Sequence, residues 1–357
     1  MATDKSNLMW YLQEPPKRCA KSKFIPWFSS DNNWNDEETN HTGISMGHRG
    51  EYNGDYKALK PKDIFGLLRR YVVEQDEALK DVSIMLYQHF QGHRCVSLLA
   101  GPTGSGKSFI AESIMNVFPK VVRMRNISNL TQNGWKGNNK VDDVFSQWEP
   151  VIVGDQTVHP IYMLDECDKL FLPKMASSEN VSVSLQSELL GYVHGARSEF
   201  NGRDDKKIIV DTRNVSIMFL GSFEVQAQKK AMKSQGTTIG FTGDQTKVRS
   251  YQDPITMEDV IAQGCTPELA GRIHQLINLR KFSEDDFKKI LKMKDRGPIR
   301  EMEEEFDITI RLKRKTIDRM AHESFESEFG MRGAKNQIHE AINKKFWTDP
   351  EFKEIEV

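Results

Sequence analysis

From about residue 58 the chain alternates short apolar runs with longer segments in which apolar positions recur every three or four residues. Short apolar runs are typical of buried strands, and the longer spacing is typical of amphipathic helices. Strands that alternate with helices predict an α/β fold with a doubly wound, mostly parallel sheet. The expected strands cover 95–100, 120–125, 161–164, 207–210 and 215–220, and the expected helices cover 61–70, 75–90, 107–117 and 183–194.

The pattern changes at both ends of the chain. The first 57 residues are rich in Asn, Asp and Gly, yet they contain Trp10, Trp27 and Trp34, whereas a disordered tail has few aromatic residues. After residue 282 helical spacing dominates, which predicts a small α-rich C-terminal domain. We therefore expect an atypical N-terminal segment (1–57), a large domain (58–281) and a small domain (282–357). The expected elements of the small domain are helices 283–292, 296–306, 315–328 and 331–346, with an alternating stretch at 307–312.

Charge and composition exclude several classes of protein. The formal net charge of −1 argues against a globally basic nucleic-acid-binding protein. No apolar stretch approaches the ~18 residues of a membrane span, and the N-terminus lacks the apolar region of a signal peptide. These features predict a cytoplasmic protein without membrane association. Cys19, Cys95, Cys167 and Cys265 are far apart and form no Cys-x-x-Cys pair, so neither a zinc site nor a disulfide framework is expected.

The strongest chemical signal is a glycine-rich loop at 101–108, Gly-Pro-Thr-Gly-Ser-Gly-Lys-Ser, between an expected strand and an expected helix. This is a Walker A phosphate loop, in which glycines let backbone N–H groups approach a triphosphate closely. Lys107 would reach the β- and γ-phosphates, and the Ser108 hydroxyl would ligate Mg²⁺. We therefore predict ATP and Mg²⁺ as cofactors. The expected nucleotide-binding residues of this loop are Gly101, Thr103, Gly104, Ser105, Gly106, Lys107 and Ser108.

A second signal follows roughly 60 residues later, where the apolar run 161–164 ends in Asp165 and Glu166. Two acids at a strand end form a solvated turn in many proteins, but after a phosphate loop they match the Walker B pattern. Asp165 is then expected to hold the Mg²⁺ shell, and Glu166 is expected to polarise the attacking water. An intact Glu166 favours a hydrolysing enzyme over a nucleotide-locked scaffold.

Residues 165–170 and 71–78 carry a specific resemblance. Asp-Glu-Cys-Asp-Lys-Leu and Tyr-Val-Val-Glu-Gln-Asp-Glu-Ala are similar to motifs of the ClpX-like AAA+ ATPases, the Clp/HslU-type protein unfoldases. The resemblance covers about 60–347 and implies an AAA+ P-loop NTPase large domain followed by a small α-rich domain. It also implies that Val72 and Val73 contact adenine, with simple core packing as the alternative explanation. Glu74 stands where this family has Gly. The N-terminal zinc domain of the family is missing, because Cys19 stands alone before residue 60.

Two arginines extend the resemblance. The segment 266–273, which contains Arg272, is similar to a family segment whose arginine acts on the γ-phosphate of the neighbouring subunit. If Arg272 acts in this way, the active site is shared and the protein is expected to form a homo-hexamer. Arg332, in Gly-Met-Arg-Gly, resembles the sensor-2 arginine that reports nucleotide state. We therefore count Glu166, Arg272 and Arg332 as the candidate catalytic residues.

Two loops suggest where hydrolysis is used. Trp135, Lys136 and Gly137 occupy the position of the aromatic pore loop of the family, so the resemblance implies a polypeptide substrate gripped by the Trp135 indole. Lys136 replaces an aliphatic residue there. Ile239, Gly240 and Phe241 match the tripeptide with which the family docks a ClpP-like peptidase. The ordinary interpretations are a local core anchor for Trp135 and a strand start for 239–241.

The preferred hypothesis is an ATP-dependent protein unfoldase and translocase that feeds a ClpP-like peptidase. The alternative is a protease-independent AAA+ remodelling factor for a protein or nucleoprotein complex. A third interpretation, a non-hydrolysing nucleotide switch, is disfavoured by Glu166 and Arg272.

Overall fold

The computed structural model describes seven stretches of the chain between residues 51 and 357. The first fifty residues lie outside the described part, and so does the predicted segment that carries Trp135. The division of the chain at 57/58 and 281/282 stays a prediction. The described residues are 51–131, 140–176, 179–201, 207–223, 254–293, 297–327 and 330–357.

A five-stranded parallel sheet forms the centre of the fold, in the order β11-β1-β10-β5-β2. Strands β1 and β10 are buried along their whole length, as expected for apolar runs covered on both faces. Because all five strands are parallel, their carboxyl ends meet at one edge of the sheet. Their bounds are β1 Val96–Ala100, β2 Val122–Asn126, β5 Ile161–Asp165, β10 Ser216–Gly221 and β11 Gln275–Asn278.

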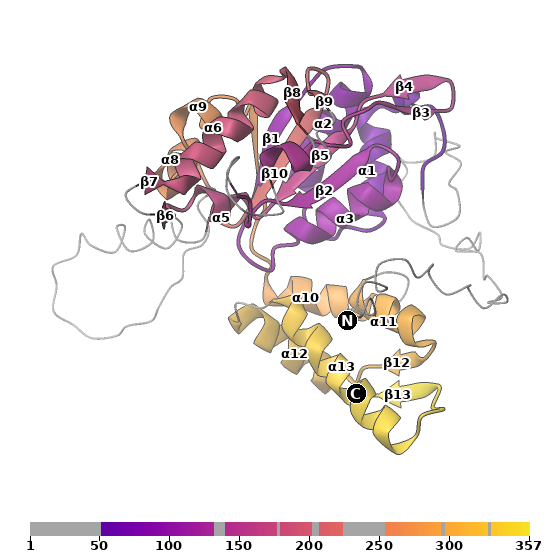
Figure 1. The fold of residues 1–357 in the computed structure, drawn as a ribbon. Coiled ribbons are helices and arrows are strands. Elements are labelled where there is room, and N and C mark those ends of the chain that lie inside the picture. The colour runs from indigo at the N-terminus through magenta and orange to yellow at the C-terminus, as the bar shows by residue number, and fades with distance from the viewer. Residues whose placement is uncertain are drawn as a thin grey trace, which may run out of the picture. The chain divides into compact units, whose positions relative to one another are not determined.

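Helices cover both faces of the sheet, so the predicted doubly wound α/β fold is confirmed (Figure 1). Successive residues of a strand point to opposite faces, and in β1 Leu98 joins one hydrophobic cluster while Leu99 joins the other. One face carries α1 Pro61–Arg69, α2 Asp76–Phe90 and α3 Lys107–Val117. The other carries α4 Val141–Val144, α5 Cys167–Phe171, α6 Val181–His194, α8 Met257–Gln263 and α9 Pro267–Ala270.

Short two-stranded ribbons lie outside the central sheet, and one corrects a prediction. The segment predicted as strand 207–210 is indeed a strand, but it pairs antiparallel with β8 and does not join the sheet. A short 3₁₀ helix, η1 Tyr56–Ala58, precedes α1. The ribbons are β3 Val151–Val153 with β4 Gln156–Val158, β6 Met175–Ala176 with β7 Glu179–Asn180, and β8 Arg197–Asn201 with β9 Lys207–Asp211.

The C-terminal elements enclose a third hydrophobic cluster, to which Val73 also packs. The first helix of this group begins after a capping box, in which Ser283 accepts from the backbone of Asp286 and the Asp286 carboxylate accepts from the backbone of Ser283. The predicted helical content is confirmed, and the alternating stretch at 307–312 contains a strand. The elements are α10 Glu284–Lys292, α11 Pro298–Phe306, β12 Thr309–Arg311, α12 Arg314–Glu326, α13 Met331–Thr348 and β13 Glu354–Glu356.

Candidate functional site

The loop after β1 has the backbone geometry that a phosphate loop needs. Gly104 and Gly106 have φ of 79° and 96°, in the left-handed region that favours glycine. Gly101 is required for space, because a Cβ there would lie 2.6 Å from the Cβ of Leu279 and 2.8 Å from the Ser105 Oγ. Gly106 precedes the first residue of α3, so the N–H groups of the helix start point toward the loop.

The polar side chains of this loop are suited to bind phosphate groups and an associated Mg²⁺ ion. The Lys107 Nζ donates to the carbonyl oxygens of Gly101 and Pro102, at 2.7 and 2.9 Å, which holds the ammonium over the loop. The Ser105 side chain is 1 % exposed and its hydroxyl has no partner in the described part of the chain, as expected of a group that awaits a ligand. Ser108 lies on the first turn of α3. A hydroxyl here and a carboxylate at Asp165 form the oxygen donor set that Mg²⁺ prefers, so these residues fit the ion.

The acidic pair of the second motif lies at the same edge of the sheet. Asp165 ends β5 and stands beside Asn126, the last residue of β2, in the parallel register. The Asp165 Oδ1 accepts from the backbone N–H of Glu166 at 2.8 Å. Glu166 has a φ of 60°, and this left-handed turn carries the chain from the strand into α5.

The Glu166 carboxylate is held by two side chains. Lys169 donates to Oε1, and the Asn126 Nδ2 donates to Oε2 at 2.9 Å. The hydrogen bond from Lys169, followed by that from Asn126, lowers the pKa of Glu166 to about 2. The carboxylate is therefore ionised but weakly basic, and each oxygen already accepts one hydrogen bond. Loss of these bonds would raise its basicity toward a water.

Asn126 is a site residue that sequence reasoning missed. Its Oδ1 accepts from the backbone N–H and the hydroxyl of Ser128, at 2.9 and 2.7 Å, which fixes the amide orientation. The available signal was a polar residue at the end of an expected strand, but the predicted strand 120–125 stopped one residue short of it.

Gln75 is a second missed residue, and it is 4 % exposed. Its Nε2 donates to the carbonyl oxygens of Ser105 and Arg280, at 3.0 and 2.8 Å, and its Oε1 accepts from the backbone of Arg280 at 3.3 Å. One amide thus joins the phosphate loop to the segment between β11 and α10. Of the two residues expected to contact adenine, Val72 is 3 % exposed and belongs to the core, while Val73 is half-buried against the third cluster.

Arg332 lies near the phosphate loop. It follows Gly330 at the start of α13, and a Cβ on Gly330 would lie 3.2 Å from the Cα of Gly104. Burial raises the pKa of Glu112 on α3, and the positive charges of Lys335 and Arg332 oppose this effect. The Arg332 guanidinium is therefore within electrostatic reach of the helix that carries the phosphate loop.

Arg272 lies at the other end of the sheet. It precedes β11, whose first residue pairs with Ser97 at the start of β1, whereas the phosphate loop follows the end of β1. Its side chain is exposed. The structure therefore separates Arg272 from the candidate catalytic residues of its own chain.

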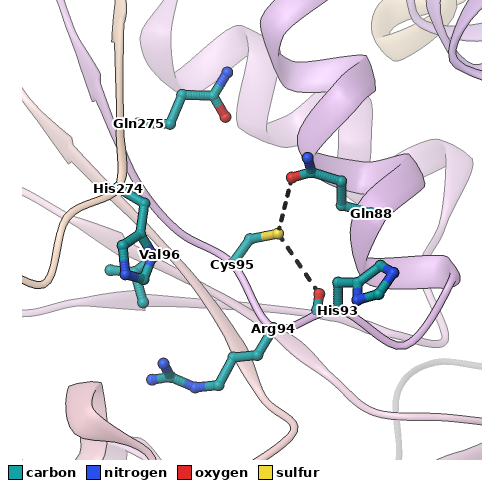
Figure 2. Close-up of a pocket in the computed structure, with 7 residues that line it drawn as sticks. All are labelled: Gln88, His93, Arg94, Cys95, Val96, His274 and Gln275. Carbon is teal, nitrogen blue, oxygen red and sulfur yellow. Dashed lines mark hydrogen bonds between the residues drawn. The ribbon is translucent and has the colours of Figure 1, made fainter.

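A cavity of about 280 Å³ opens at this same end of the sheet. Figure 2 shows the Cys95 thiol between the side chain of Gln88 and the backbone oxygen of His93, to which it donates at 3.3 and 3.5 Å. Because these residues precede or begin β1 and β11, the cavity is not the nucleotide site. Its lining consists of Gln88, His93, Arg94, Cys95, Val96, His274 and Gln275.

Six predicted site residues lie outside the described residues. They belong to the two loops expected to act on a polypeptide and on a peptidase, so both functions stay predictions. These residues are Trp135, Lys136 and Gly137, and Ile239, Gly240 and Phe241.

Comparison with known proteins agrees with this geometry. Residues 97–230 match the family model AAA, the ATPase family associated with various cellular activities. The chain is 24% identical over 329 residues to the "ATP-dependent Clp protease ATP-binding subunit ClpX" of Borrelia duttonii, covering 83% of this chain and 76% of that protein. The protein of the same name from Treponema denticola is 22% identical over 347 residues, covering 85% of this chain and 82% of the relative. The chain is thus similar to ClpX over most of its length, and its residues 97–230 match the AAA ATPase family.

It is therefore a nucleotide-binding enzyme that hydrolyses ATP. The glycine loop and the Asp165–Glu166 pair lie within the matched residues, and Gln75, Arg272 and Arg332 lie outside them. Within the described part of the chain, none of the helices combines the length and the apolar composition that a membrane crossing needs.

Proposed function

We propose that this AAA+ ATPase is an ATP-driven protein unfoldase and translocase that works as a homo-hexameric ring with a ClpP-like peptidase. The printed names of its relatives, which are ATP-binding subunits of a Clp protease, support this proposal. We also propose the division into an N-terminal segment (1–57), a large domain (58–281) and a small domain (282–357).

The site residues have distinct proposed roles. The backbone of the glycine loop and Lys107 bind the phosphates, and Ser108 and Asp165 hold Mg²⁺, which when bound neutralises developing phosphate charge. Glu166, once free of its partners, orients the attacking water. Arg332 links nucleotide state to the C-terminal helices.

The observation that carries the ring proposal is the position of Arg272. A strand of five residues spans about 16 Å, so the two ends of β1 are well separated. Arg272 lies at one end and the phosphate loop at the other. An exposed guanidinium in this position reaches a γ-phosphate only in a second copy of the chain, where its rigid fork suits phosphate oxygens.

Mixing two inactive variants tests the shared site. Arg272→Ala is expected to lower kcat by roughly 10³-fold with nucleotide binding retained, because an arginine finger acts on the transition state. Glu166→Gln is expected to lower kcat by at least about 10²-fold. In rings mixed at equal amounts, about one quarter of the sites combine an intact Glu166 with an intact Arg272, so about a quarter of the activity should return.

One result would contradict the shared site, and one variant serves as its control. If mixing restores no activity although both variants form rings, Arg272 does not act between copies. Arg314→Ala, which changes an exposed arginine on α12, is the matched control and should retain full activity.

The use of hydrolysis is tested separately. Trp135→Ala is expected to hydrolyse ATP but to fail to unfold a tagged protein, because the indole grips the polypeptide. Replacing Ile239 and Phe241 by Ala is expected to abolish association with a ClpP-like peptidase while unfolding persists. Unfolding with no peptidase association in the unmodified protein would instead favour a protease-independent remodelling factor.

A further inference from the structure

Glu74 has a backbone conformation that disfavours it. Its φ is 61°, in the left-handed region, where a residue with a Cβ is less stable than glycine by about 1 kcal/mol. It follows Val72 and Val73 and precedes the buried Gln75 at the start of α2. A conformation of this kind persists only where surrounding contacts enforce it.

The Glu74 carboxylate makes such contacts with two cations from distant parts of the sequence. Oε1 lies 2.8 Å from the Lys289 Nζ on α10, and Oε2 lies 3.3 Å from the Arg280 guanidinium, which follows β11. Arg280 also pairs with the Asp286 carboxylate at 2.6 Å. These four residues, Glu74, Arg280, Asp286 and Lys289, form one ion-pair network, which we call the Glu74 cluster.

The Glu74 cluster is connected to the phosphate loop through the next residue of the chain. The Gln75 amide bonds the Ser105 carbonyl and both backbone groups of Arg280. Arg280 therefore forms an ion pair with Glu74 through its side chain and hydrogen bonds with Gln75 through its main chain. A shift of Glu74 moves Gln75, and Gln75 contacts the loop that surrounds the phosphates.

We propose that Glu74 is a positioning residue for nucleotide binding: its ion pairs with Arg280 and Lys289 hold the backbone at 74–75 so that Gln75 supports the phosphate loop and the start of α10 together. This inference rests on the ATPase function and does not require unfolding or a peptidase. Ordinary exposed ion pairs contribute little, and Glu74, Arg280 and Lys289 are 33%, 47% and 57% exposed. These ion pairs differ from ordinary ones because they fix a strained backbone at Glu74, and the next residue, Gln75, is buried and hydrogen-bonded to the phosphate loop.

The test compares equilibrium binding of a fluorescent ATP analogue by full-length variants, with steady-state kcat and KM beside it. Glu74→Gln should weaken binding and raise KM about fivefold, with kcat within about twofold, because two exposed pairs are lost together. Lys289→Gln should have a smaller effect, and the double variant should be no worse than Glu74→Gln, because both changes break the same pair. Raising the salt to about 0.5 M should weaken nucleotide binding by wild type more than it weakens binding by Glu74→Gln, because only wild type has these ion pairs to lose.

Glu74→Gly separates backbone strain from charge. Glycine accepts this φ without strain, so the variant should unfold about 1–2 °C higher than wild type and bind nucleotide with an affinity between those of Glu74→Gln and wild type. A merely structural role would make stability and affinity change together. Lys292→Gln, on the same helix and without an acidic partner among the described residues, is the control and should match wild type.

Three results would overturn the proposal. The first is a Glu74→Gln affinity equal to that of Lys292→Gln, and the second is a double variant whose defect equals the product of the single defects. The third is the absence of nucleotide binding by every variant and by wild type, which would refute the ATPase assignment itself. Loss of unfolding or of peptidase association with the binding differences intact would contradict only the proposed function.

Discussion

Release of Glu166 from its partners should accelerate basal ATP hydrolysis. Each carboxylate oxygen accepts a hydrogen bond, one from Lys169 and one from Asn126, and these bonds hold the group in place and lower its basicity toward a water. If release precedes attack, the free energy that holds the carboxylate is part of the barrier to hydrolysis. Asn126→Ala and Lys169→Met each remove one partner and leave Glu166 in place.

The structure gives the size and the order of the effects. The pKa of Glu166 falls from 4.5 to about 2, which corresponds to about 3 kcal/mol before solvent screening. Because the Glu166 and Lys169 side chains are 32% and 55% exposed, we reduce this to about 1–2 kcal/mol. Lys169 is the larger cause and Asn126 the second. We therefore expect kcat to rise about twofold to threefold in Asn126→Ala and about fivefold in Lys169→Met.

A coupled ATPase assay at saturating ATP measures these changes, and KM should stay within about twofold because neither residue belongs to the phosphate loop. Asn129→Ala is the matched control, because Asn129 is exposed and close in sequence to Asn126. A fall in kcat in both variants, or an equal rise in the control, would show that the two partners do not restrain Glu166.

Two further changes have definite expectations. Gly101→Ala places a Cβ 2.6 Å from that of Leu279, so it should weaken nucleotide binding at least about tenfold and lower the free energy of unfolding by about 1–3 kcal/mol. Gly191→Ala is the control, because Gly191 lies within α6 and a Cβ there would meet no neighbouring atom within 4 Å. Denaturant titrations should show that it raises the free energy of unfolding by about 0.5–1 kcal/mol. Burial lowers the pKa of His89 to about 4, from 6.5 in the unfolded chain, so its neutral form contributes full stability above pH 6.5 and up to about 3 kcal/mol is lost as pH falls to 4. Urea titrations at several pH values give the free energy of unfolding, which should fall more steeply with decreasing pH in wild type than in His89→Gln. An equal dependence on pH in the two proteins would contradict the argument.

The fold was largely predictable because its signals are local. Apolar runs such as 96–100 and the glycine pattern at 101–108 are contiguous, and they sufficed to place four strands of the central sheet, its longer helices and the phosphate loop. Strand β11 was not predicted, because it has four residues of which one is fully buried, so it lacks the apolar run of its neighbours. Strand β9 was predicted as a strand, but its pairing with β8 depends on contacts that the pattern of a single segment does not specify.

The site was predictable only where its chemistry lies in one motif. The contact of Asn126 with Glu166 spans 40 residues and depends on the parallel register of β2 with β5. The bonds of Gln75 span 30 residues to Ser105 and 205 to Arg280. A sequence pattern identifies side chains that share one loop or strand end, and it does not identify a buried amide that joins three separate segments.

The convergence of distant segments on the phosphate loop has a thermodynamic consequence. Residues on both sides of the connection into α10 border the glycine positions, since Leu279 stands against Gly101 and Phe282 lies 3.7 Å from a Cβ placed on Gly106. Gly330, before α13, stands against Gly104. A nucleotide that reshapes this loop must therefore change the free energy of contacts that belong to the C-terminal helices. Such coupling is reciprocal: if nucleotide binding changes the affinity for a ligand that contacts α10 or α13, that ligand changes the affinity for nucleotide by the same factor.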